Sequence, residues 1–140
     1  MTSTFSIICA GARGYSICQK VKASIKSKNK EVRQGQLVRI DIRLINRSGG
    51  DIQEGRWTMM LPAGVNFGKA STDAVKEESP GLIVYERLNI YAQKALYFII
   101  AVKIEGATGS VVFRSFLNDR AAYCEATSAL TVRIYSLPTL

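Results

Sequence analysis

Strict alternation of aliphatic and charged residues over residues 38–44 constrains the fold of this chain more than any other feature. The charged positions are Arg39, Asp41 and Arg43, and the aliphatic positions between and beside them are Val38, Ile40, Ile42 and Leu44. A helix would scatter these four aliphatic side chains around its axis, whereas a β-strand places all four on one face. The segment therefore predicts a half-buried strand whose charged residues face solvent.

Similar runs recur along the chain. Alternating or β-rich segments occupy residues 20–26, 57–61, 82–85, 94–104, 111–116 and 130–135, with turn residues between them and no convincing amphipathic helix. This pattern predicts an all-β fold, a β-sandwich of about seven or eight mostly antiparallel strands. We expect the aliphatic face of 38–44 to share one core with residues of two later strands, namely Leu96, Phe98, Ile100, Val102, Leu130, Val132 and Ile134.

The length of 140 residues matches a single domain. Residues 1–17 are rich in Gly, Ser and Ala and show no clear period, so we expect a lead-in segment there, a single sandwich domain over 18–136 and a tail over 137–140. The longest apolar run, residues 95–102, is far shorter than the roughly 18 residues of a membrane span. The N-terminus lacks the basic region of a signal peptide, which leaves open both a cytosolic chain and a piece of a longer secreted protein.

The chain contains no histidine, which removes the commonest general base and the commonest nitrogen ligand of zinc. The adjacent Glu77 and Glu78 lie in a polar stretch, where neighbouring carboxylates stay hydrated and point apart. Cys9, Cys18 and Cys124 are too scattered for a zinc site; two of them could form a disulfide, and their spacing does not say which two. We therefore expect no catalysis, no cofactor and no tightly bound metal.

Positive charge is concentrated near the start of the predicted domain. The net charge is +8, from 19 Lys and Arg against 11 Asp and Glu. Residues 20–33 contain one acid and the six cations Lys20, Lys22, Lys26, Lys28, Lys30 and Arg33. Such a cluster can bind a polyanion, whether nucleic acid, an anionic glycan or lipid head groups. The simpler interpretation is a solvated strand face whose lysines protect a sheet edge, because no RNA-recognition motif, zinc finger or basic helix accompanies the cluster.

Two segments have the composition of structural turns. Residues 46–48, Asn-Arg-Ser, match the acceptor pattern for N-glycosylation, but an Asn46 side chain that caps the strand exit is the favoured interpretation. Pro62 ends the pairing of the strand before it, and Gly64 can adopt a positive φ in the following turn. We expect structural roles for Asn46, Pro62 and Gly64.

The order of these pieces resembles the conserved-repeat domain of prokaryotic surface and cell-wall proteins, an immunoglobulin-like β-sandwich. Gly35 before the alternating strand, the stretch 46–49 after it and the segment 61–67, LPAGVNF, carry the resemblance, which covers about residues 18–135. The chain departs from the family in lacking a carboxylate shortly before Leu61 and in being strongly basic. The resemblance implies an extracellular or cell-surface structural or interaction module within a longer protein, often one of several in a row, that contacts a protein or a cell-surface polymer. A cytoplasmic location is the alternative, and the oligomeric state stays open.

The same resemblance bears on the cysteines. In immunoglobulin-like sandwiches the first and last strands are often parallel neighbours, and Cys18 and Cys124 precede the first and last predicted strands. The resemblance therefore implies a Cys18–Cys124 disulfide, with Cys9 left over. The alternative is that all three thiols are reduced, which a cytosolic location favours.

Overall fold

The computed structural model describes residues 3–9, 20–29, 31–107, 109–119 and 124–135. These residues form eleven β-strands and no helix. The strands are β1 (Ser3–Cys9), β2 (Val21–Ser27), β3 (Glu31–Arg33), β4 (Leu37–Asn46), β5 (Ile52–Met60), β6 (Val65–Ala70), β7 (Val75–Ser79), β8 (Leu82–Ile90), β9 (Ala95–Ile104), β10 (Gly109–Asp119) and β11 (Cys124–Tyr135). No helix long and apolar enough to cross a membrane occurs in this part of the chain.

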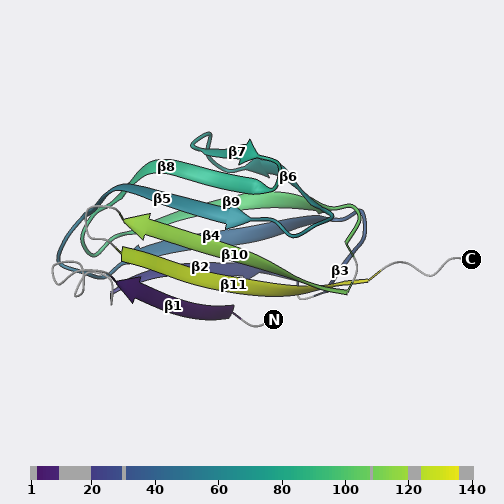
Figure 1. The fold of residues 1–140 in the computed structure, drawn as a ribbon, viewed down its shortest axis with the longest axis horizontal. Coiled ribbons are helices and arrows are strands. Elements are labelled where there is room, and N and C mark those ends of the chain that lie inside the picture. The colour runs from purple at the N-terminus through teal and green to yellow at the C-terminus, as the bar shows by residue number, and fades with distance from the viewer. Residues whose placement is uncertain (1–2, 10–19, 30, 108, 120–123, 136–140) are drawn as a thin grey trace, which may run out of the picture.

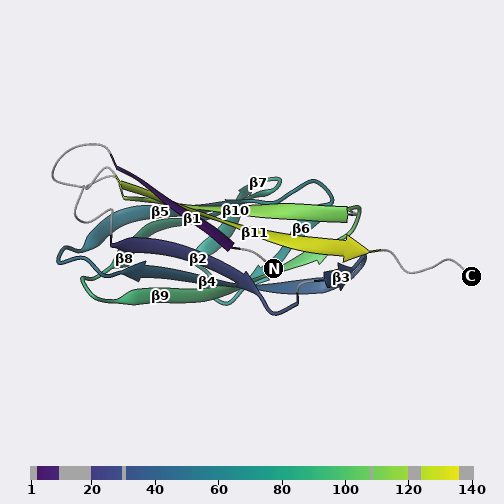
Figure 2. The ribbon, with the colours of Figure 1, turned by 90° about the horizontal axis from the view of Figure 1, so that it is seen from below.

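The strands form two sheets that pack face to face (Figures 1 and 2). One sheet has the order β1-β11-β10-β5-β8-β7, with β3 also pairing with β11, and the other has the order β2-β4-β9-β6. The β3–β11 pair is parallel, and the other described pairs are antiparallel. This architecture confirms the predicted all-β sandwich of mostly antiparallel strands, with more strands than the expected seven or eight.

The core lies between the sheets and contains the aliphatic residues that the alternation singled out. Ile42 on β4 faces Ile25 on one neighbouring strand and Phe98 on the other, and all three are buried. The expected partners on β9 and β11 are buried as well, except for Leu96, which is half-buried against the core. Trp57 of the seven-stranded sheet meets Phe98 of the four-stranded sheet edge to face, with ring centroids 4.9 Å apart. The predicted shared core is confirmed.

Four strands lie outside the alternating or β-rich segments of the sequence, and one of them is β6, which follows the Pro62–Gly64 turn. β1 falls within the expected lead-in segment 1–17 and pairs antiparallel with β11. β7 falls in a polar stretch, and only Val75 of its five residues is buried, so no alternation marks it as a strand. β3 is three residues long, too short to show a period. The predicted domain boundaries at residues 18 and 136, and the tail 137–140, lie outside the described residues.

Asn46 occupies a buried position at the end of β4. Its Nδ2 donates hydrogen bonds to the carbonyl oxygens of Gly50 (2.8 Å) and Ile90 (2.9 Å). Its Oδ1 accepts from the backbone N–H of Ser48 at 3.0 Å. The side chain thus ties the turn after β4 to the end of β8, and a glycan on Nδ2 would replace one of the two donated hydrogens.

The Pro62–Gly64 segment forms the turn from β5 to β6. The carbonyl of Pro62 accepts the N–H of Val65 at 3.2 Å, and that of Gly64 accepts the N–H of Glu105 at 2.8 Å. Gly64 has φ +82°, and a Cβ added there would lie 2.5 Å from the backbone nitrogen of Ala107. This position requires glycine for both its φ and its close approach to the 105–107 turn.

Candidate functional site

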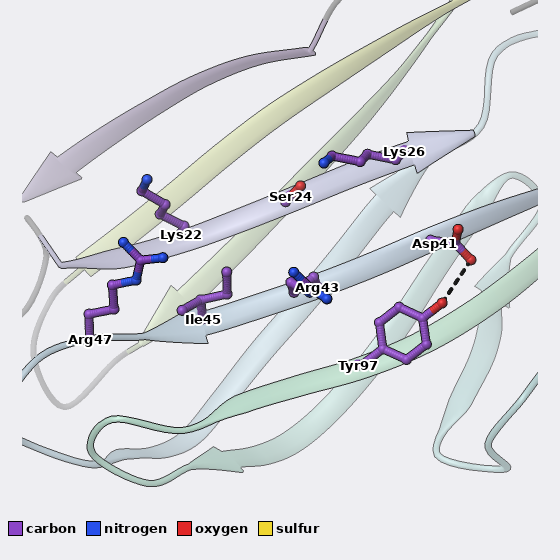
Figure 3. Close-up of a pocket in the computed structure, with 8 residues that line it drawn as sticks. All are labelled: Lys22, Ser24, Lys26, Asp41, Arg43, Ile45, Arg47 and Tyr97. Carbon is purple, nitrogen blue, oxygen red and sulfur yellow. Dashed lines mark hydrogen bonds between the residues drawn. The ribbon is translucent and has the colours of Figure 1, made fainter. Parts of the chain in front are cut away.

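The outer face of the four-stranded sheet carries a concentration of cations. Because β2 and β4 alternate buried and accessible side chains, their charged residues all lie on the side away from the core. We call the part of this surface over β2 and β4 the basic face; its cations are Lys22 and Lys26 of β2, Arg39 and Arg43 of β4, and Arg47 just after β4. Figure 3 shows the side chains of Lys22, Lys26, Arg43 and Arg47 over the two adjacent strands.

The strand register brings these residues together. Across the β2–β4 ladder, Lys22 faces Ile45, Ser24 faces Arg43 and Lys26 faces Asp41. On the other side of β4, Tyr97 of β9 faces Arg43. The ladder continues past the strand ends, since the N–H of Arg47 donates to the carbonyl of Lys20 at 2.8 Å. Cations separated by about 20 residues in sequence therefore form one surface.

The basic face is hollowed by a depression of about 380 Å³, and the residues that line it are Lys22, Ser24, Lys26, Asp41, Arg43, Ile45, Arg47 and Tyr97. The lining thus combines four cations and a single acid with one aliphatic and one aromatic side chain. This combination favours an anionic group bound by charge and hydrogen bonds from Lys and Arg.

The acid in this depression is already engaged. Oδ1 of Asp41 accepts a hydrogen bond from Nε of Arg39 at 3.1 Å. It accepts another from the hydroxyl of Tyr97 at 3.1 Å (Figure 3). A hydrogen bond with Tyr97 and the adjacent Asp41 raise the pKa of Arg39, which stays charged. Arg43 and Arg47 form no ion pair with any residue that the structure describes. Their charges are available to a ligand.

The six-residue cluster predicted from the sequence is divided. Lys22 and Lys26 lie on the basic face, while Lys20 and Lys28 are exposed just beyond the two ends of β2. Arg33 lies on β3 beside β11, where its Nε donates to the hydroxyl of Tyr135 at 3.1 Å and its guanidinium carbon stands 5.9 Å from the ring centroid. Lys30 is outside the described residues.

Sequence reasoning missed Arg39, Arg43, Arg47 and Tyr97 as members of the site. A signal for Arg39 and Arg43 exists, because they alternate with the aliphatic residues of 38–44 and must face away from the core. The sequence pattern does not show that segment 20–26 pairs with segment 38–44. This pairing places the polar faces of the two strands side by side. Tyr97 was missed for another reason. The outer face of its strand is partly apolar, so the sequence does not mark that face as polar.

Only one partner of the predicted Cys18–Cys124 disulfide lies among the described residues. Cys124 begins β11, and Cys18 lies outside the described residues. The strand that follows Cys18, β2, belongs to the four-stranded sheet, whereas β11 belongs to the other sheet. The parallel neighbour of β11 is the short β3.

Comparison with known proteins places the fold. No family model matches the chain, and no curated protein matches it significantly. A cohesin module from a Clostridium perfringens family 33 glycoside hydrolase superposes with a TM-score of 0.61, at 15% identity over 84% of this chain and 98% of that module. The CARDB domain of a Pyrococcus furiosus protein superposes with a TM-score of 0.56, at 9% identity over 82% of this chain and 87% of that domain. At such low identity these likenesses show the fold alone: the chain is an immunoglobulin-like β-sandwich.

Proposed function

We propose that the protein is a non-catalytic interaction module that binds an anionic polysaccharide through the basic face. The observation that carries this proposal is the alignment of Lys22, Lys26, Arg43 and Arg47 around one depression whose single acid, Asp41, is held by Arg39 and Tyr97. Like charges gathered on one face repel one another, and binding of an anionic ligand would relieve that repulsion.

The spacing of the charges favours a polymer over a single small anion. Side chains on one face of a strand repeat every two residues, or about 6.7 Å. Lys22 and Lys26 are therefore about 13 Å apart along β2, and Arg43 of β4 and Arg47 just after it are the same number of residues apart. Charges spread over this length match successive anionic groups of an extended chain.

Polysaccharide is favoured over nucleic acid for a structural reason. Single-stranded nucleic acid binds by stacking bases on exposed aromatic rings along a basic groove. Tyr97 is the aromatic residue that lines the depression, and its hydroxyl is bound to Asp41. The lining thus offers one aromatic ring beside its charges, rather than the row of rings on which successive bases stack.

The absence of histidine from the sequence supports a non-catalytic role. Among the described residues, no group of three or more Cys, Asp or Glu could hold a metal ion. The fold is shared with a cohesin module and a CARDB domain. The resemblance to the conserved-repeat domain supports a place in a surface or secreted protein, as one unit of a longer chain.

Heparin, a sulfated polysaccharide, is the probe for this proposal. We expect binding that weakens steadily as NaCl is raised, measured by titration calorimetry, because cation–anion contacts release counterions. The double variant Arg43→Glu/Arg47→Glu should lower affinity about tenfold or more at low salt, since it replaces attraction by repulsion at two of the four cations that line the depression.

The matched control is Lys76→Glu/Arg114→Glu. Both residues are exposed on the seven-stranded sheet, and the control has the same net charge as the test variant. It should retain most of the affinity. Equal losses in the two variants would show that only net charge matters and would refute the assigned face. Tighter binding of single-stranded DNA than of heparin, lost in the same test variant, would keep the face and refute the ligand class.

A further inference from the structure

Two cysteines take facing positions where β1 meets β11. The two strands lie side by side and run antiparallel (Figure 1). Their register has seven consecutive pairs, from Ser3 opposite Leu130 to Cys9 opposite Cys124. Directly opposed residues of an antiparallel pair have Cα atoms about 4.5–5.5 Å apart. This spacing falls within the range of about 4.4–6.8 Å that a disulfide spans.

The register makes this juxtaposition specific. The β1–β11 ladder contains no bulge, so the Cys9–Cys124 pair belongs to the same unbroken register as the other six pairs. A shift by one residue would place Cys9 opposite Glu125 or a residue before β11, and would exchange the two faces of the whole strand. On its other side, Cys124 faces Asp119 of β10. Of the two residues that lie opposite Cys124 on its neighbouring strands, one is therefore a cysteine, Cys9.

We propose that Cys9 and Cys124 form a cross-strand disulfide that joins β1 covalently to β11. In this step the two thiols lose two protons and two electrons in total, and one S–S bond forms. A small-molecule disulfide such as oxidised glutathione accepts them, and its own S–S bond breaks to give two thiols. The bond persists in an oxidising compartment.

The bond acts on an edge of the sandwich. β1 is the last strand of the seven-stranded sheet on that side, and its described strand pairing is with β11 alone. A strand held by one ladder opens more readily than a central strand. A disulfide at the end of the ladder keeps β1 in place, and β1 in turn covers backbone groups of β11 that would otherwise pair with another chain.

The inferred bond and the Cys18–Cys124 bond expected from the sequence compete for one thiol. They leave different cysteines free: Cys18 in the first case and Cys9 in the second. Trypsin separates all three, because cleavage after Arg13, Lys20, Arg120 and Arg133 puts them on peptides 1–13, 14–20 and 121–133.

The experiment is thiol mapping of the intact protein after equilibration with oxidised and reduced glutathione. Free thiols are alkylated under denaturing conditions, and the tryptic peptides are analysed by mass spectrometry. We expect one alkylated cysteine per chain, Cys18, together with a disulfide-linked pair of peptides 1–13 and 121–133. Alkylation of all three cysteines, or of Cys9 alone, would overturn the inference.

Serine variants provide the controls. Cys9→Ser and Cys124→Ser should each leave two alkylatable thiols, whereas Cys18→Ser should leave none. Hydrogen exchange then tests the effect on the edge: the amides of residues 3–9 should exchange roughly tenfold faster in Cys9→Ser than in Cys18→Ser, while those of β5 keep their rates. Unchanged exchange over residues 3–9 would refute the role of the bond in holding β1.

Discussion

Two serines in the core face each other across β10 and β11 but differ in what they bond. Ser115 and Ser128 are opposite one another in the register, and both are buried. The indole N–H of Trp57 donates to Oγ of Ser115 at 2.7 Å. Oγ of Ser128 has no hydrogen-bond partner among the described residues. The two hydroxyls therefore contribute to stability with opposite signs.

Replacing each serine by alanine separates these contributions. Ser115→Ala should lower the free energy of unfolding by about 1–3 kcal/mol, because it leaves the buried indole N–H without an acceptor. Ser128→Ala should be neutral or stabilising, because it removes a buried hydroxyl that is not hydrogen-bonded. Urea unfolding followed by far-UV circular dichroism measures both. Equal costs would show that the Trp57–Ser115 bond adds nothing.

Gly64 allows a second test at the level of one residue, with Gly81 as its control. Both glycines have φ +82°, but a Cβ at Gly81 would come no closer than 3.8 Å to a neighbouring atom. Gly81→Ala should therefore cost only the left-handed strain of about 1–2 kcal/mol. Gly64→Ala should cost distinctly more in urea unfolding, because the backbone of the 105–107 turn must also move. Heparin affinity of the folded Gly64→Ala variant should be unchanged, and a selective loss of affinity would make this turn part of the site.

At the level of elements, Asn46 shows how a single side chain can hold two strand ends. Asn46→Asp keeps the shape and the acceptor oxygen for Ser48 but cannot donate to Gly50 and Ile90. It also places a buried negative charge beside two carbonyl oxygens. We expect a loss of about 3 kcal/mol or more in urea unfolding at neutral pH. A cost below about 1 kcal/mol would mean that these bonds are exchanged for water without penalty.

Strands that bury one whole face could be predicted from the sequence, and strands that do not could not. β4 lies between two neighbouring strands and alternates buried and accessible residues over its ten positions. Its aliphatic residues therefore predict both its extended conformation and its buried side. β7 buries only Val75 and is held by pairing with β8. The stability of such an edge strand comes from backbone hydrogen bonds, which leave no mark on residue type.

Only part of the candidate site could be predicted from the sequence, because residue type does not reveal which strands pair. Charge density along the chain identified Lys22 and Lys26, but the register of β2 against β4 added Arg43 and Arg47. Arg33, close to the lysines in sequence, lies on β3 and is engaged with Tyr135. Sequence proximity predicts a shared surface only within one strand, and across strands the pairing decides.

Across the whole molecule, the excess positive charge is unevenly distributed. On the seven-stranded sheet, a depression beside β7 and β8 is lined by Asp73, Lys76 and three glutamates. Two of these, Glu78 and Glu86, form ion pairs with Arg56 at 2.6 and 3.0 Å. The four-stranded sheet has the opposite balance on its basic face. The proposed anionic ligand would therefore be attracted to one side of the sandwich and oriented before contact.

Because both sheets contribute to one core, we expect the sandwich to unfold as a unit. Trp57 is the single tryptophan of the chain and packs against Phe98 of the opposite sheet, so its fluorescence reports on contact between the layers. Its urea transition should coincide with that of far-UV circular dichroism, which reports on the strands themselves. Separate transitions would show that the two sheets come apart before the strands unfold.

Ile42→Ala tests the same unit from the four-stranded sheet. Ile42 is 0% exposed, and its truncation should lower the free energy of unfolding by about 2–5 kcal/mol in both signals, because the cavity cannot close fully. Leu37→Ala is the control from the same strand: Leu37 is 61% exposed on the outer face, and its loss should cost about 0.5 kcal/mol or less. The reverse order of costs would mean that β4 is shifted by one residue, and the basic face would then lie on the wrong side of the sheet.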